Sequence, residues 1–171
     1  MLLWKEKRSG KEALLIDGAR RVGKSWIVEE FAKNEYDSYV LIDFSNTKNS
    51  IRRLFIDYEG QMDAFFMHLR LETGVKLFDR KSLIVFDEIQ NFPKAREAIK
   101  YLVKDGRYDY IETGSLMSIN ANVKDINIPS EEHRIDMFPM DFEEFLWALG
   151  DDMMMDYTRE CFANRKPLGQ S

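Results

Sequence analysis

The residues with the clearest chemical potential form a short turn near the start of the chain. Residues 18–25 read Gly-Ala-Arg-Arg-Val-Gly-Lys-Ser, the Gly-x-x-x-x-Gly-Lys-Ser pattern of a phosphate-binding loop. Gly18 and Gly23 can adopt positive φ, and without Cβ atoms they let backbone N–H groups face an anion. The Lys24 ammonium could then reach the β- and γ-phosphates of a nucleotide, and the Ser25 hydroxyl could hold Mg²⁺.

The whole turn and the residue that follows it are candidates for nucleotide binding. The helix expected after the turn adds the positive end of its dipole. Arg20 or Arg21 could contact a phosphate, or both could be solvated arginines at the tip of the turn. The candidates are Gly18, Ala19, Arg20, Arg21, Val22, Gly23, Lys24, Ser25 and Trp26.

A second candidate group lies at the end of the apolar run SLIVFD, residues 82–87. Its last residue, Asp87, is followed at once by Glu88, so two carboxylates are adjacent in the sequence. We expect Asp87 to hold Mg²⁺ together with Ser25, and Glu88 to polarise the attacking water as general base. Phosphoryl transfer needs neutralised charge and a placed nucleophile more than covalent help, so Lys24, one metal ion and one base suffice. We therefore assign Lys24 and Glu88 as catalytic. The alternative is an ordinary turn with two acidic residues.

Further candidates come from a later strand end and from arginines. The Thr113 and Ser115 hydroxyls could bond the γ-phosphate or the water, or their turn could have no role. A neighbouring subunit's arginine completes many such sites, and the sequence does not choose among three candidates. They are Arg96, Arg134 and Arg159.

These residues need a scaffold, and five segments of strand length supply it. Strands are expected over residues 12–17, 38–44, 82–87, 109–113 and 133–138. Helices are expected over residues 24–32, before Gly74, between Pro93 and Gly106, after a capping box at 141–144, and from Met153. Residues 1–11 read as a basic entry, 45–58 as short helical pieces and 118–131 as a mobile loop. The alternation predicts a three-layer α/β sandwich with a mainly parallel sheet, whose first, third and fourth strand ends meet at one edge.

Composition narrows the class of protein. The 171 residues are 44% apolar, enough for one domain with a core, and the net charge of −5 disfavours nucleic acid as the main partner. A single cysteine excludes an internal disulfide, and two histidines with one cysteine disfavour a structural zinc site. No apolar run reaches the length of a signal peptide or membrane span. We expect a cytoplasmic chain without a membrane partner.

Four stretches together resemble prokaryotic AAA-family ATP-binding proteins: GARRVGKS, LIVFDEIQ, TGSL and IDMFPMDFEEFLWALGD. The resemblance implies ATP as the nucleotide and a P-loop core of the additional-strand type, with the Thr113 strand between the first and third strands. It also implies that residues 1–150 form this core, and that 151–171 begin a helical connection to a C-terminal domain of unknown function absent from this chain. Family members often carry Gly-Arg before the fifth strand, where this chain has Glu-Glu-His-Arg, so the resemblance does not assign an arginine finger to Arg134.

The expected function is binding of Mg-ATP, with hydrolysis that drives or times a conformational change. The alternative is a nucleotide-gated binding module with little turnover, which could be DNA-associated. A GTPase is disfavoured because the chain lacks an Asn-Lys-x-Asp motif. The sequence leaves a homo-oligomer open as a further partner, since a neighbour could supply the missing cation.

Overall fold

The computed structural model describes residues 1–115, 132–167 and 169. The chain forms two compact units, Met1–Met137 and Phe138–Ser171, and each is described by itself. The loop expected over residues 118–131 lies outside the described residues.

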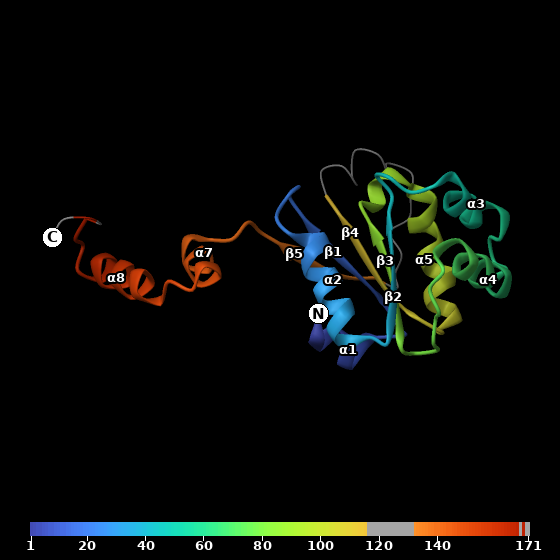
Figure 1. Cartoon of the computed structure of the whole chain (residues 1–171), viewed down its shortest axis with the longest axis horizontal. Helices are drawn as coiled ribbons and strands as arrows, with labels where there is room; N and C mark the ends of the chain where they lie inside the picture. Colours follow the sequence, from blue (N-terminus) through green and yellow to red (C-terminus); the bar gives the residue numbers. More distant parts are fainter. Residues whose placement is uncertain (116–131, 168, 170–171) are drawn as a thin grey trace. The chain divides into compact units, whose positions relative to one another are not determined.

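The first unit is built on a five-stranded sheet in which every neighbouring pair is parallel (Figure 1). The strand order is β2-β3-β4-β1-β5, so β4 lies between β1 and β3. The expected α/β class and the additional-strand order are therefore confirmed. The strands are β1 (Ala13–Gly18), β2 (Ser38–Asp43), β3 (Ser82–Asp87), β4 (Asp109–Gly114) and β5 (Glu132–Met137).

Helices cover both faces of this sheet and complete three layers. The helices α1 (Leu2–Arg8) and α2 (Lys24–Glu35) pack on one face. The helices α3 (Asn49–Asp57), α4 (Met62–Thr73) and α5 (Pro93–Asp105) pack on the other, as Figure 1 shows. A short 3₁₀ helix, η1 (Ile89–Asn91), follows β3 directly.

Helix α1 is an element that the sequence did not predict. The basic entry expected over residues 1–11 is instead helical from Leu2 to Arg8. Trp4 anchors this helix to the domain. Its side chain is buried in the hydrophobic core between the sheet and the helices α1 and α2, called the α1/α2-side core below, and its Nε1 donates to the Glu12 carbonyl at 3.2 Å. Leu3 on the same helix is exposed.

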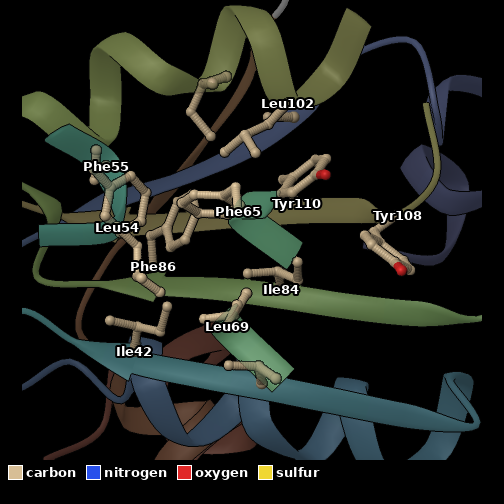
Figure 2. Packing of buried hydrophobic residues seen from close by; sticks show 14 of the residues in the cluster. Ile42, Leu54, Phe55, Phe65, Leu69, Ile84, Phe86, Leu102, Tyr108 and Tyr110 are labelled. Carbon is tan, nitrogen blue, oxygen red and sulfur yellow. The ribbon is translucent and has the colours of Figure 1, made fainter. Parts of the chain in front are cut away.

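The core on the α3–α5 side is rich in aromatic rings, which Figure 2 shows packed between the helices and the sheet. Phe55 of α3 meets Phe65 of α4 with ring centroids 5.0 Å apart, and Phe86 of β3 at 5.6 Å. Helix α3 forms because Ile51, Leu54 and Phe55 recur at helical spacing and are all buried. The ambiguous stretch 45–58 thus contains one amphipathic helix.

Strand alternation decides which polar groups face α2. Leu83 and Val85 of β3 pack into the α1/α2-side core, so Asp87 lies on that same side by the two-residue period of a strand. Thr113 of β4 shares its side with Ile111, which belongs to the same core. The polar ends of β3 and β4 are therefore directed toward the start of α2.

The second unit contains α7 (Phe142–Leu149) and α8 (Asp152–Ala163). The predicted capping box begins α7: the Glu144 N–H donates to Asp141 Oδ1 at 2.8 Å, and the Asp141 N–H donates to Glu144 Oε2 at 3.0 Å. Among the large apolar side chains described in this unit, Leu146 is buried and most others are exposed. In the described part of the chain, no helix is long and apolar enough to cross a membrane.

Candidate nucleotide site

The two glycines of the turn are needed for different reasons. Gly23 has φ 94° and is the N-cap of α2, so it occupies the left-handed region that favours glycine. Gly18 ends β1 and does not have the positive φ that the sequence allowed for. A Cβ at Gly18 would collide with the carbonyl oxygen of Met137 on β5. Gly18 is therefore required because two strands approach each other closely.

The N-terminus of α2 has the features of an anion-binding site. No side chain caps its N-terminus, and its first turn holds no acidic residue. The first N–H groups of a helix lack intrahelical partners, so those of Lys24, Ser25 and Trp26 are available to an anion. The Trp26 side chain is 69% exposed. Arg20 and Arg21 are also exposed, and Arg21 has φ 66°.

The Lys24 side chain lies within the turn. It is only 4% exposed, and its Nζ donates to the carbonyls of Gly18 at 3.0 Å and Ala19 at 2.7 Å. These bonds hold the ammonium among the backbone atoms of the phosphate-binding pattern. That Lys24 reaches the phosphates of a nucleotide stays a prediction.

Ser25 and Asp87 meet although 62 residues separate them. The Ser25 Oγ donates to Asp87 Oδ1 at 2.9 Å. The Thr113 hydroxyl of β4 donates to the same carboxylate oxygen. Strands β3 and β4 are neighbours, which brings Thr113 beside Asp87. The structure thus joins α2, β3 and β4 at one carboxylate.

Glu88 follows Asp87 in a left-handed backbone conformation, with φ 53° and ψ 48°. Its N–H donates to Thr113 Oγ1 at 3.2 Å, and its Oε2 accepts from Gln90 Nε2 at 2.5 Å. Thr113 is fully buried, and its hydroxyl bridges the Asp87 carboxylate and the Glu88 backbone. Ser115 is half-buried directly after β4.

The three arginine candidates are all engaged in ion pairs. Arg96 of α5 is 3% exposed, with Nη2 2.8 Å from Glu132 and Nη1 3.7 Å from Glu112. Burial of this guanidinium contradicts a role in which it reaches a neighbouring subunit. Arg134 pairs with Asp17 at 2.9 Å and, on the same strand, with Asp136 at 2.6 Å. Arg159 pairs with Glu143 in the second unit.

The residues at the ends of α2, β3 and β4 fit Mg²⁺ bound with a nucleotide. Mg²⁺ prefers oxygen ligands and is commonly held by one or two protein groups together with phosphate oxygens. Ser25 and Asp87 supply a hydroxyl and a carboxylate within hydrogen-bond distance of each other. The described residues contain no cluster of three or more His, Cys, Asp or Glu side chains that could hold a metal ion. Mg²⁺ held by Ser25 and Asp87 could take its remaining ligands from phosphate oxygens and water.

Two further features belong to this region. The sequence places Gln90 two residues after the acidic pair, where it could help orient water or sense a neighbour, and in the structure its side chain donates to the Glu88 carboxylate. Glu112 is a carboxyl buried completely between β4 and α5. Its alternation with Tyr110 on the strand could have marked it as a core position.

Comparison with known proteins identifies the family. Residues 10–146 match a family model described as AAA domain. The chain belongs to the AAA domain family. Its members are nucleotide-binding domains of the ATPase class, which agrees with the P-loop and the acidic pair of this AAA domain.

A comparison with solved structures includes PCH-2 from C. elegans. The two sequences are 13% identical, and the TM-score is 0.42. The similarity covers 91% of this chain and 42% of the PCH-2 chain, so this AAA domain spans less than half of that length. No curated protein sequence matches the chain.

Proposed function

We propose that this AAA domain binds Mg-ATP through its P-loop and hydrolyses it, and that the cycle drives or times a conformational change. The contact between Ser25 Oγ and Asp87 Oδ1 is the observation that supports this most strongly. It joins the turn that recognises phosphate to the strand end that carries Glu88. An isolated Gly-rich turn would not need a carboxylate 62 residues away.

Binding would be shared by backbone and side chains of the turn. The N–H groups from Gly18 to Trp26 would bond phosphate oxygens, and Lys24 would neutralise their charge. Ser25 and Asp87 would hold Mg²⁺, which when bound supplies further neutralisation of the phosphates. Thr113 fixes Asp87 for this task, while Ser115 would lie near the γ-phosphate or the water.

Glu88 would act as the general base. It would accept a proton from a water molecule, whose oxygen then bonds the γ-phosphorus while the bond to the β–γ bridging oxygen breaks. ADP would leave with the electron pair of that bond. The half-buried position of Glu88 beside Asp87 supports this role.

Steady-state phosphate release tests the proposal. Glu88→Gln keeps the size of the side chain but cannot accept the proton, so we expect turnover to fall about 100-fold or more while ATP still binds. Glu6→Gln, a substitution on the exposed face of α1, is the control and should leave turnover unchanged. Equal turnover of wild type and Glu88→Gln would remove Glu88 as the base.

A nucleotide-gated switch with little turnover is the second candidate, and the arginines favour it. Arg96 and Arg134 are engaged with carboxylates of their own chain, and a missing arginine finger costs about 10³- to 10⁵-fold in rate. Turnover per chain that rises with protein concentration would support a homo-oligomer whose neighbour completes the site. Slow turnover at every concentration, with Mg²⁺-dependent binding of ATP, would support the switch, and rapid turnover of the monomer would exclude it.

The receiver of the conformational change is a further part of the proposal. The resemblance supports residues 1–150 as the ATPase core, residues 151–171 as the start of a helical connection, and a C-terminal domain as the receiver. A DNA-associated role would appear as salt-dependent retardation of duplex DNA in a gel. Unchanged mobility at low salt would exclude it for this chain.

A further inference from the structure

A buried glutamine lies behind the acidic pair. The Gln90 side chain in η1 is 4% exposed, and its Nε2 donates to Glu88 Oε2 at 2.5 Å. Its Oε1 is buried and accepts no hydrogen bond from the described residues. A buried amide that satisfies only its donor side is uncommon, because an unmade buried hydrogen bond costs about 1–3 kcal/mol. The contact with Glu88 is therefore the one that fixes this side chain.

The orientation of the Gln90 amide follows from the chemistry of its partner. A carboxylate only accepts hydrogen bonds, so the NH₂ group must face Glu88. The opposite orientation would place Oε1 of Gln90 against a carboxylate oxygen and leave the NH₂ group buried without a partner. The direction of the bond is thus set by the Glu88 carboxylate.

The segment that carries Gln90 is itself well fixed. The Asn91 N–H donates to the Glu88 carbonyl at 3.0 Å, and the Phe92 N–H donates to the Ile89 carbonyl at 3.0 Å. Ile89 is completely buried, and η1 packs against β4 and α5. A hydrogen bond from this segment can therefore hold a flexible side chain in one direction.

The Glu88 carboxylate needs a hydrogen bond to fix its orientation, because three side-chain torsions separate it from the backbone. Thr113 accepts the hydrogen bond of the Glu88 N–H and so fixes only the backbone of Glu88, which is in the left-handed conformation. Gln90 engages Oε2 of the carboxylate, and Oε1 would be the atom that accepts the proton of water. The two contacts together fix Glu88 at both ends.

We infer that Gln90 is a positioning residue that directs the Glu88 carboxylate toward the attacking water. This inference rests on the proposed role of Glu88 as general base. Gln90 does not touch the substrate; it acts through Glu88. A purely structural Gln90 would stabilise η1 without changing the turnover of a folded protein.

The kinetic test compares Gln90→Met, Glu88→Gln and the double variant. Methionine has the length of glutamine but no donor, so we expect kcat to fall about 10- to 100-fold, as for a misplaced catalytic group, with the KM for ATP within about twofold. In the Glu88→Gln background, Gln90→Met should cause no further loss, because no base remains to be positioned. Gln90→Asn, which keeps the amide but is one methylene shorter, should retain more turnover than Gln90→Met.

A spectroscopic test reads the contact in the protein without nucleotide. The side-chain NH₂ signals of Gln90 are assigned in the ¹⁵N–¹H spectrum of the wild-type protein through their correlations to the Gln90 backbone. We expect Glu88→Ala to shift them, because their acceptor is removed, whereas Glu6→Gln should not. This arm keeps the inference testable if Gln90→Met does not fold.

The outcomes separate the two proposals. If Glu88→Gln turns over ATP as wild type does, Glu88 is not the base, and the proposed function and the inference both fail. If Glu88→Gln is slow but Gln90→Met matches wild type, the inference alone is overturned. Additive losses in the double variant, or Gln90 NH₂ signals that Glu88→Ala does not move, would also overturn it.

Discussion

Glycine is required at position 18 by the neighbouring strand rather than by the backbone conformation of Gly18 itself. A Cβ there would meet the Met137 carbonyl, whereas a Cβ at Gly60 would meet nothing. We predict that Gly18→Ala lowers the free energy of unfolding by about 2–3 kcal/mol, as an overpacked site does. The matched control Gly60→Ala should cost about 1–2 kcal/mol, because Gly60 has φ 74°. Urea unfolding measures both values, and equal losses would contradict the close approach of β1 and β5.

The chemistry-bearing residues divide into those that the sequence could predict and those that it could not. Lys24 and Ser25 follow from the spacing of the turn, and Asp87 and Glu88 from an apolar run that ends in two carboxylates. The bridging bonds of Thr113 could not be predicted, because they depend on the adjacency of β3 and β4 and on a left-handed Glu88. Whether these residues bind and hydrolyse ATP stays a prediction.

At the scale of elements, strands that are buried on both faces could be predicted from the sequence. All six residues of β3 are buried, and such near-continuous apolar runs are typical of parallel sheets. Helix α1 could not be predicted from its sequence, because only one of its side chains, Trp4, is buried, and charged residues follow it. The strand order also could not follow from alternation alone, which predicts a parallel sheet but not its sequence of strands. The resemblance supplied that order.

The contact of α5 with β4 and β5 contains a buried charge cluster that should make stability depend on pH. Arg96 lies 3.7 Å from Glu112 of β4 and 2.8 Å from Glu132 of β5. Burial raises the pKa of the Glu112 carboxyl well above its usual range; the Arg96 charge opposes this, and the nearby Glu132 carboxylate adds to it. Burial raises the pKa of Glu132 as well. The folded chain therefore retains protons that the unfolded chain has lost.

The sign of the pH effect follows from this retention. The stabilising contribution of protonated Glu112 is complete below the pKa of an unfolded glutamate, 4.5, and is lost as pH rises toward the folded value. We predict that the free energy of unfolding of wild type, relative to Glu112→Gln, falls between pH 5 and pH 8 by at most about 1.4 kcal/mol per pH unit. Urea unfolding of both proteins across this range checks the slope. Parallel pH profiles would show that Glu112 does not titrate differently in the folded chain.

For the whole molecule, the two units differ in how they bury apolar surface. Both core clusters are formed by residues of the first unit, on either side of the sheet. The described part of the second unit buries Leu146 and Cys161 and exposes several large apolar side chains, including Phe162. The first unit thus carries the packed core as well as every proposed ligand of the nucleotide.

The central claim is that Lys24, Ser25 and Asp87 hold the phosphates of ATP together with Mg²⁺. Titration calorimetry of ATP into the whole chain, with Mg²⁺ and with EDTA, tests it most directly. We predict binding that weakens strongly when Mg²⁺ is removed and that is abolished by Lys24→Ala, while Lys33→Ala, on the same helix but in surface ion pairs, binds ATP as wild type does. Equal ATP affinities for wild type and Lys24→Ala would contradict the account.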